Sequence, residues 1–124
     1  MSRTILIVDD EPSVRKMLTK ILKEEADVFL DAKNGVQAKQ LCYEQDVDLM
    51  ITDIVMPEKH GIDLIIEIKK EKPNLPIIAI SGGGGISGRF DYLEIAGTLG
   101  VENILHKPFK ASELRSFVRS ALSD

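Results

Sequence analysis

The chain has 124 residues, of which 44% are hydrophobic and 29% are charged, and its formal net charge is −4. These values predict one folded domain over residues 1–124 and exclude a disordered chain. Nucleic-acid-binding domains carry an excess of basic residues, whereas this chain has an excess of acidic ones. The single cysteine excludes an intrachain disulfide. Apolar runs reach only four residues, whereas a membrane span needs about 20 and a signal peptide about 7–15. We therefore expect a cytoplasmic protein that binds neither a membrane nor nucleic acid directly.

Strand and helix signals alternate along the first half of the chain. Ile5–Val8 is a continuous apolar run rich in β-branched residues, which predicts a strand buried on both faces. Pro12 suits the first turn of a helix, and the apolar stripe of this helix comprises Val14, Met17, Leu18, Ile21 and Leu22. Residues 28–30 then predict a short strand, residues 34–35 a turn, residues 36–42 a helix, and residues 47–52 a strand that ends at Asp53.

The alternation continues in the second half of the chain. Residues 56–61 predict a loop, and Ile62, Ile65 and Ile66 mark a third helix, which ends before Pro73. Residues 77–80 predict a fourth strand, and residues 81–88, which hold five of the nine glycines, predict irregular structure. A helix over residues 93–99, a strand over residues 101–105 and a helix over residues 114–122 complete the chain.

Five strands that alternate with five helices predict an α/β fold, in which a doubly wound parallel sheet is covered by helices on both faces. The common strand order for five such strands is 2-1-3-4-5. Ligands of these folds bind beyond the carboxyl ends of the strands, at the point between strands 1 and 3 where the winding reverses. This rule selects candidate site residues from the sequence.

Charged and polar residues follow the strands at the edge where this fold brings their ends together. Asp9 and Asp10 follow the first strand, Asp53 the third, Ser81 the fourth and Lys107 the fifth. Two carboxylates about 5 Å apart repel by roughly 3 kcal/mol at an effective dielectric constant of about 20, so the acidic set predicts a bound hard cation, Mg²⁺ or Mn²⁺. Carboxylates, a metal ion, a hydroxyl and an ammonium group together suit phosphoryl transfer. Each residue alone would be an ordinary turn or surface residue, so the prediction rests on the whole set.

With these residues in place, the sequence resembles the receiver domain of two-component response regulators, the family of the bacterial chemotaxis regulator. The motifs that carry the resemblance are Ile-Leu-Ile-Val-Asp9-Asp10-Glu11, Asp53-Ile-Val-Met-Pro57 with Gly61, Ser81, and Lys107-Pro108-Phe109. The resemblance covers essentially the whole chain and implies the flavodoxin-like receiver fold. It implies that the protein is a signalling switch rather than an enzyme. The switch would accept a phosphoryl group from a sensor histidine kinase or phosphotransfer protein. We expect a stand-alone receiver without an output domain, which acts on a downstream target protein that the sequence does not name.

The resemblance also implies roles for the acidic residues. Asp53 is the expected phosphoacceptor. Asp10, Asp53 and the backbone carbonyl of Val55 are expected to bind Mg²⁺ directly, and Asp9 directly or through water. The residues themselves do not distinguish a covalent aspartyl phosphate from a bound phosphate.

The remaining roles concern the phosphoryl group and the switch. Lys107 is expected to pair with the phosphoryl group and with Asp53, and Ser81, next to Gly82, to donate a hydrogen bond to a phosphoryl oxygen. The Lys107–Pro108 bond is expected to be cis. Ile104 occupies a switch position where the family often has an aromatic residue, so it cannot present a ring there. We expect the output surface to comprise the helix over residues 93–99, the strand over residues 101–105 and the last helix.

Other interpretations remain open at this stage. A phosphorelay intermediate and a phosphorylation-independent interaction module are both compatible with the receiver fold. The same type of sheet binds a flavin in flavodoxins and serves aspartate-based phosphatases, but three carboxylates would repel a flavin phosphate, and Val55 stands where such phosphatases need a second aspartate. The glycine run from Gly82 to Gly85 predicts either a mobile linker or a loop whose amides cradle a phosphate.

Overall fold

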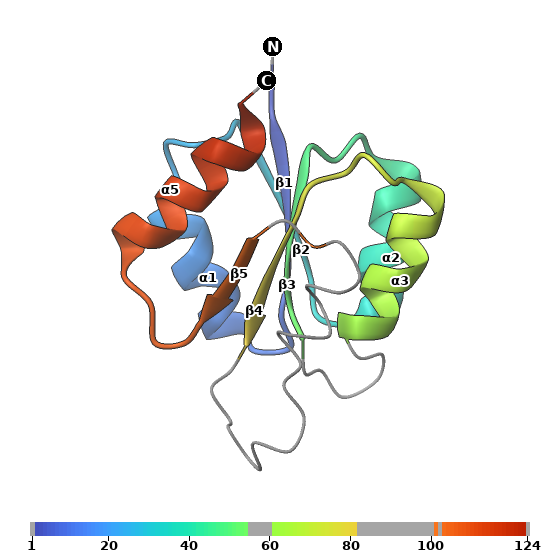
Figure 1. Cartoon of the computed structure of the whole chain (residues 1–124), viewed down its shortest axis with the longest axis horizontal. Helices are drawn as coiled ribbons and strands as arrows, with labels where there is room; N and C mark the ends of the chain where they lie inside the picture. The colour runs from blue at the N-terminus through green and yellow to red at the C-terminus, as the bar shows by residue number, and fades with distance from the viewer. Residues whose placement is uncertain (1, 55–60, 82–100, 102, 124) are drawn as a thin grey trace.

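The computed structural model describes residues 2–54, 61–81, 101 and 103–123 (Figure 1). The described strands are β1 (Thr4–Val8), β2 (Val28–Ala32), β3 (Leu49–Asp53), β4 (Ile77–Ser81) and β5 (Asn103–His106). The described helices are α1 (Pro12–Ile21), α2 (Gly35–Glu44), α3 (Gly61–Glu71) and α5 (Ala111–Leu122). The expected loop over residues 56–60, the glycine-rich segment 82–88 and the expected helix over residues 93–99 lie outside the described residues. No helix in the described part of the chain is long and apolar enough to cross a membrane.

The five strands form one parallel sheet in the order β2-β1-β3-β4-β5, which confirms the predicted topology. α1 and α5 cover one face of the sheet, and α2 and α3 cover the other (Figure 1). Because helices cover both faces of the sheet, every side chain of Ile5–Val8 in β1 is buried, which explains the uninterrupted apolar run. Ile5 and Ile7 pack toward α1 and α5, while Leu6 and Val8 pack toward α2 and α3, because successive side chains of a strand point to opposite faces.

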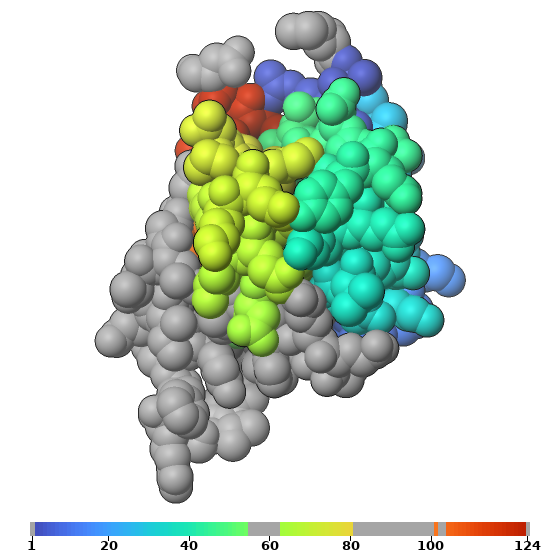
Figure 2. Space-filling model, turned by 90° about the vertical axis from the view of Figure 1, so that its right-hand side faces the viewer, coloured from blue at the N-terminus to red at the C-terminus, as the bar shows by residue number. Residues whose placement is uncertain are grey.

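Figure 2 shows α2 and α3 side by side on the second face. Their apolar sides pack on the sheet through Ala38, Cys42, Leu64, Ile65 and Ile68. Polar side chains also join the two helices: Lys39 Nζ lies 2.6 Å from a Glu67 carboxylate oxygen, and the Tyr43 hydroxyl donates a hydrogen bond to Glu71. Cys42 is 1% exposed, as expected for a structural cysteine on an apolar helix face.

Two of the predicted apolar stripes were partly wrong. Met17 is 42% exposed, although Leu18 and Leu22 of the same helix are buried. Ile66 is also 42% exposed, whereas Leu64, Ile65 and Ile68 are buried among the α3 side chains that the structure describes. Helical spacing alone cannot fix the centre of a buried stripe, because the neighbouring elements decide how wide a face is covered.

The first residues of the helices and the last residues of the strands lie near the edge of the sheet that carries the candidate site residues. Pro12 is the first residue of α1, as predicted. Asn34 caps α2, since its side-chain oxygen accepts a hydrogen bond from the Gln37 backbone N–H at 2.8 Å. The third strand, Leu49–Asp53, begins two residues later than predicted and ends at Asp53, as predicted. The fifth strand, Asn103–His106, begins two residues later than predicted and ends one residue later, next to Lys107.

Candidate functional site

The sheet register brings the sequence-predicted residues to one edge. Val8 is aligned with Thr52 in β1 and β3, Asp53 with Ile80 in β3 and β4, and Ser81 with His106 in β4 and β5. Asp9 therefore directly follows β1, Asp53 ends β3, Ser81 ends β4 and Lys107 directly follows β5. These are the carboxyl ends of parallel strands, where ligands of doubly wound sheets bind.

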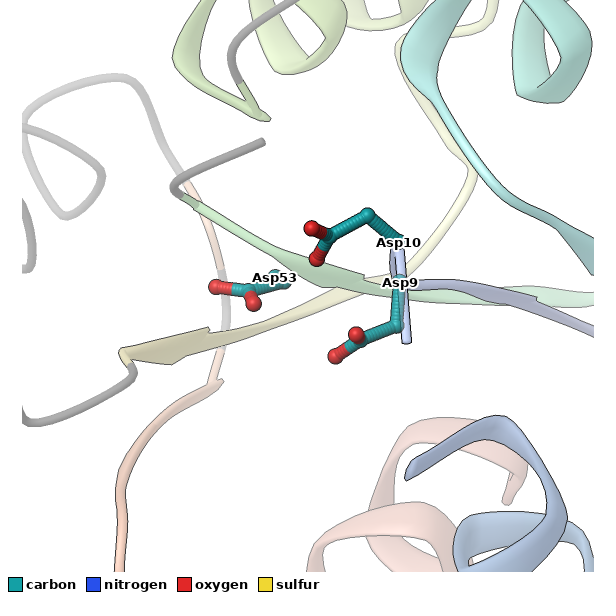
Figure 3. A group of neighbouring side chains, drawn as sticks. All are labelled: Asp9, Asp10 and Asp53. Carbon is teal, nitrogen blue, oxygen red and sulfur yellow. The ribbon is translucent and has the colours of Figure 1, made fainter. Parts of the chain in front are cut away.

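Three carboxylates converge at this edge. Oxygen atoms of Asp9, Asp10 and Asp53 all lie within 4.8 Å of one another. Figure 3 shows Asp9 and Asp10 leaving consecutive positions in different directions, with the Asp53 side chain beside them. Asp9 is 2% exposed and Asp53 8% exposed, whereas Asp10 is open to solvent. The cluster thus has two buried members and one that faces the outside.

Asp9 is held by several contacts. One of its carboxylate oxygens accepts a hydrogen bond from the Glu11 backbone N–H at 2.9 Å, and the other lies 3.9 Å from Lys107 Nζ. Its backbone N–H donates to the Ala32 carbonyl at 3.1 Å, and its own carbonyl accepts from Arg15 Nη1 at 2.7 Å. These contacts fix both the backbone and the carboxylate of Asp9 at the edge of the sheet.

The pKa of Asp9 is raised from 3.8 to about 6. Burial of the carboxylate is the main cause, and the neighbouring charges of Asp53 and Asp10 raise the pKa further. The Glu11 N–H and the Lys107 ammonium group act in the opposite direction, because both stabilise the ionised form. The raised pKa reflects the cost of keeping the Asp9 carboxylate ionised in a buried position, with two further negative charges nearby.

The donor set fits a divalent cation. The cluster offers carboxylate oxygens, which are the ligands that Mg²⁺ and Mn²⁺ prefer in proteins. A cation among them would stabilise the ionised form of Asp9, which burial and the neighbouring carboxylates disfavour. Val55, whose backbone carbonyl was expected to complete the ligand set, lies outside the described residues.

Lys107 forms an ion pair with a member of the acidic cluster that the resemblance did not name as its partner. Lys107 Nζ pairs with Asp9, whereas the resemblance pointed to Asp53 as its carboxylate partner. A contact between Lys107 and Asp53 stays a prediction. The Lys107–Pro108 peptide bond is cis, the isomer that the resemblance implied.

The other expected switch residues are only partly described. Ser81 is the last residue of β4, and Gly82 lies outside the described residues. Ile104 in β5 is half-buried and packs against the apolar cluster beneath α2 and α3. His106 is exposed.

Sequence reasoning missed one residue that bears on the site. Arg15 of α1 donates one hydrogen bond to the Asp9 carbonyl at 2.7 Å and another to the Asp31 carboxylate at 2.8 Å. It thereby joins α1 to the ends of β1 and β2. No motif pointed to Arg15, because the contact depends on how α1 lies against the sheet.

Comparisons with known sequences point to one family. The model of the family described as response regulator receiver domain matches residues 5–119. The chemotaxis protein CheY of Halobacterium salinarum is 34% identical over 124 residues, which are 100% of this chain and 97% of that protein. The transcriptional regulatory protein CusR of Escherichia coli is 36% identical over 95% of this chain but only 50% of its own length. The chain therefore spans about half the length of the transcriptional regulators that it matches.

Solved structures give the same fold. A response regulator receiver domain protein from Clostridium thermocellum superposes with a TM-score of 0.86 at 28% identity, over 97% of this chain and 94% of that one. The response regulator TrrA from Thermotoga maritima, solved in complex with Mg²⁺-BeF, superposes with a TM-score of 0.81 at 30% identity, over 97% and 99% of the two chains. The ligand in that structure is one that an acidic cluster of this composition suits.

Proposed function

The chain belongs to the response regulator receiver domain family, and we propose that it is a phosphorylation-controlled switch of two-component signalling with Asp53 as its phosphoacceptor. Members of this family are signalling phosphoacceptors rather than catalysts. The observation that carries the proposal is the convergence of Asp9, Asp10 and Asp53 within 4.8 Å, with Lys107 at 3.9 Å from Asp9. The ends of three strands, β1, β3 and β5, contribute to this arrangement, so the fold itself assembles it.

The proposed reaction is a phosphoryl transfer from a phosphohistidine of the donor. A carboxylate oxygen of Asp53 attacks the phosphorus, the new O–P bond forms as the N–P bond breaks, and the imidazole leaves with the electron pair and takes a proton from water. Asp10, Asp53 and the Val55 carbonyl would hold Mg²⁺, with Asp9 bound directly or through water. When bound, the cation supplies positive charge close to the phosphoryl oxygens.

Lys107 and Ser81 would recognise the product. The Lys107 ammonium group already lies at the acidic cluster, from which it would form a charge-assisted contact with the phosphoryl group. The Ser81 hydroxyl would donate a hydrogen bond to a phosphoryl oxygen. Because both contacts need the phosphoryl group, they stabilise one conformation selectively, which is the requirement for shifting a two-state equilibrium.

The proposed output surface follows from chain connectivity. Ser81 ends β4 and leads into Gly82 and the glycine-rich segment, so a movement of Ser81 toward Asp53 would be transmitted to the chain that follows it. The surface would comprise the expected helix over residues 93–99 together with β5 and α5. Of these, the structure describes β5 and α5.

Receiver domains as a class partner with histidine kinases, and the particular kinase and target of this chain are open. We propose a protein partner for the signalling step, with the phosphorelay intermediate as the alternative. The two differ in whether the phosphoryl group moves on from Asp53. Transfer of the label from Asp53 to a purified histidine phosphotransfer protein would favour the relay.

The proposed function is tested by incubating the protein with acetyl phosphate and Mg²⁺. Intact-mass spectrometry should show the addition of one phosphoryl group, which hydroxylamine should remove, because acyl phosphates react with that nucleophile. Omission of Mg²⁺ should suppress the addition. A chain that remains unlabelled with Mg²⁺ present, while folded by circular dichroism, would contradict the proposal.

A further inference from the structure

A second charged feature, distinct from the three carboxylates, is a groove between α1 and β2, which Arg15 also lines. The groove has a volume of about 390 Å³. Lys16, Lys20 and Lys23 line it from the helix side, and Phe29 and Asp31 line it from β2. Its surface therefore combines an apolar floor with a basic wall, although the chain as a whole carries a net charge of −4.

The three lysines are uncompensated within the part of the chain that the structure describes. Lys16, Lys20 and Lys23 are exposed, and the ion pairs between described residues involve other cations. Asp31, the acidic residue of the groove, is already paired with Arg15 at 2.8 Å. Like charges at adjacent turns of a helix destabilise it slightly, so the stripe needs a reason other than the stability of α1.

The strand beside this wall has a free edge. β2 is the outer strand of the sheet and pairs with β1 alone among the described strands. An outer strand presents unpaired backbone N–H and C=O groups, to which an extended segment of another chain can add. Phe29 and Asp31 point toward the α1 side, since Phe29 packs against the apolar cluster beneath α1 and α5 and residues two apart share a face.

The spacing of the lysines suits an extended acidic segment. Residues four apart in an α-helix are separated by about 6 Å along the axis, and residues three apart by about 4.5 Å. Alternate residues of an extended strand are about 6.6 Å apart on one face. Acidic side chains at alternate positions of a segment beside β2 would therefore meet Lys16 and Lys20 of α1 in turn, and Lys23 lies in the turn that follows the helix.

We propose that the groove between α1 and β2 is a docking site for an extended, acidic segment of a partner protein, which adds to the edge of β2 and places alternate carboxylates against Lys16, Lys20 and Lys23. The side-chain stems of the segment cover Phe29. The proposal does not depend on phosphorylation of Asp53, because none of these residues belongs to the acidic cluster.

Two other anionic partners fit the groove less well. A nucleic-acid duplex needs a broad basic surface, whereas the lysines of the groove lie on α1 and the turn that follows it, in a chain of net charge −4. Binding to an anionic membrane by a lysine-rich helix needs an exposed apolar helix face, whereas Leu18 and Leu22 of the apolar stripe are buried in the core and Phe29 is half-buried.

The experiment uses a fluorescein-labelled peptide of about 10 residues in which glutamate alternates with valine, a pattern that favours an extended conformation. Fluorescence anisotropy measures its binding to the whole chain, and NMR with ¹⁵N-labelled protein locates it. We expect saturable binding with shifts at Phe29, Asp31 and the α1 lysines. A peptide with glutamine in place of glutamate should bind at least about tenfold more weakly.

Matched variants test whether peptide binding depends on the lysines of the groove or only on the total charge of the protein. Lys16→Gln/Lys20→Gln should weaken peptide binding at least about fivefold, whereas Lys70→Gln/Lys110→Gln, which removes the same charge from exposed positions elsewhere, should change it less than about twofold. Circular dichroism confirms that both variants fold. Absence of saturable binding, equal losses in the two variants, or shifts confined to other surfaces would overturn the proposal. The proposal would also be overturned if single-stranded DNA or phosphatidylserine vesicles bound more tightly than the peptide and Lys16→Gln/Lys20→Gln abolished that binding.

Discussion

Lys107 and Asp9 form an ion pair that connects the end of β5 to the end of β1, with 3.9 Å between Lys107 Nζ and a carboxylate oxygen. β4 and β3 lie between these two strands in the sheet, so the lysine side chain spans the edge where the candidate site lies. The Asp9 side chain is 3% exposed and that of Lys107 25% exposed. The ammonium group is therefore at the acidic cluster before any phosphoryl group is present.

Lys107→Ala should separate phosphorylation from its conformational consequence. The variant keeps all three carboxylates, so Mg²⁺ should still bind, but it loses the ammonium group that lies beside Asp9 and would contact the phosphoryl group. NMR spectra before and after beryllofluoride should show the parent's shifts in β5 and α5, and the variant should lose most of them. Lys110→Ala, at an exposed position three residues away, is the control. Shifts of parental size in the Lys107 variant would rule out the assigned role.

Asp53→Asn should abolish labelling by acetyl phosphate and leave the fold intact. The carboxylate is the nucleophile in the proposed reaction, and an amide oxygen is a poor substitute. Intact-mass spectrometry should show one added phosphoryl group in the parent and none in the variant. Asp46→Asn, which changes an exposed carboxylate near the opposite end of β3, should be labelled like the parent. Equal labelling of Asp53→Asn and the parent would refute the assignment.

Mg²⁺ should raise the melting temperature of the parent, because a cation that binds the folded chain relieves the repulsion among its carboxylates. Asp10→Ala removes one expected direct ligand and should reduce this rise by more than half at the same concentration. A thermal-shift titration measures both, with Asp46→Ala as the control for a lost surface charge. An unchanged response in Asp10→Ala would count against the metal site.

The raised pKa of Asp9 predicts a pH-dependent cost to stability. Between the unfolded value of 3.8 and the folded value of about 6, the folded chain binds more protons than the unfolded chain, so this contribution to stability falls as pH rises. The cost is complete above about pH 6 and absent below pH 3.8. In metal-free buffer, Asp9→Asn should therefore be more stable than the parent at pH 7, by about 1 to 3 kcal/mol.

Urea unfolding at several pH values checks this prediction. The stability difference between Asp9→Asn and the parent should shrink as pH falls from 7 to about 4, because protonation neutralises Asp9 in the folded parent. Mg²⁺ should also reduce the difference at pH 7, since the cation stabilises the ionised parent. A difference that does not change with pH would show that the Asp9 charge is not the source of the cost.

Much of the fold was predictable because local rules determine it. The apolar run Ile5–Val8 required cover on both faces, and alternation of strands with helices left a right-handed doubly wound sheet as the natural topology. The same rules predicted that Asp9, Asp10 and Asp53 would meet, since the carboxyl ends of parallel strands share an edge. These predictions need only residue types and their order along the chain.

What the tertiary structure decided depends on distances between segments that are far apart in the sequence. The pairing of Lys107 with Asp9 and the contact of Arg15 with the Asp9 carbonyl follow from how β5 and α1 lie against β1. The exposure of Met17 and Ile66 depends on how much of each helix its neighbours cover. The raised pKa of Asp9 depends on burial. A sequence pattern carries none of these quantities, because burial and contact between remote side chains exist only once the chain has packed.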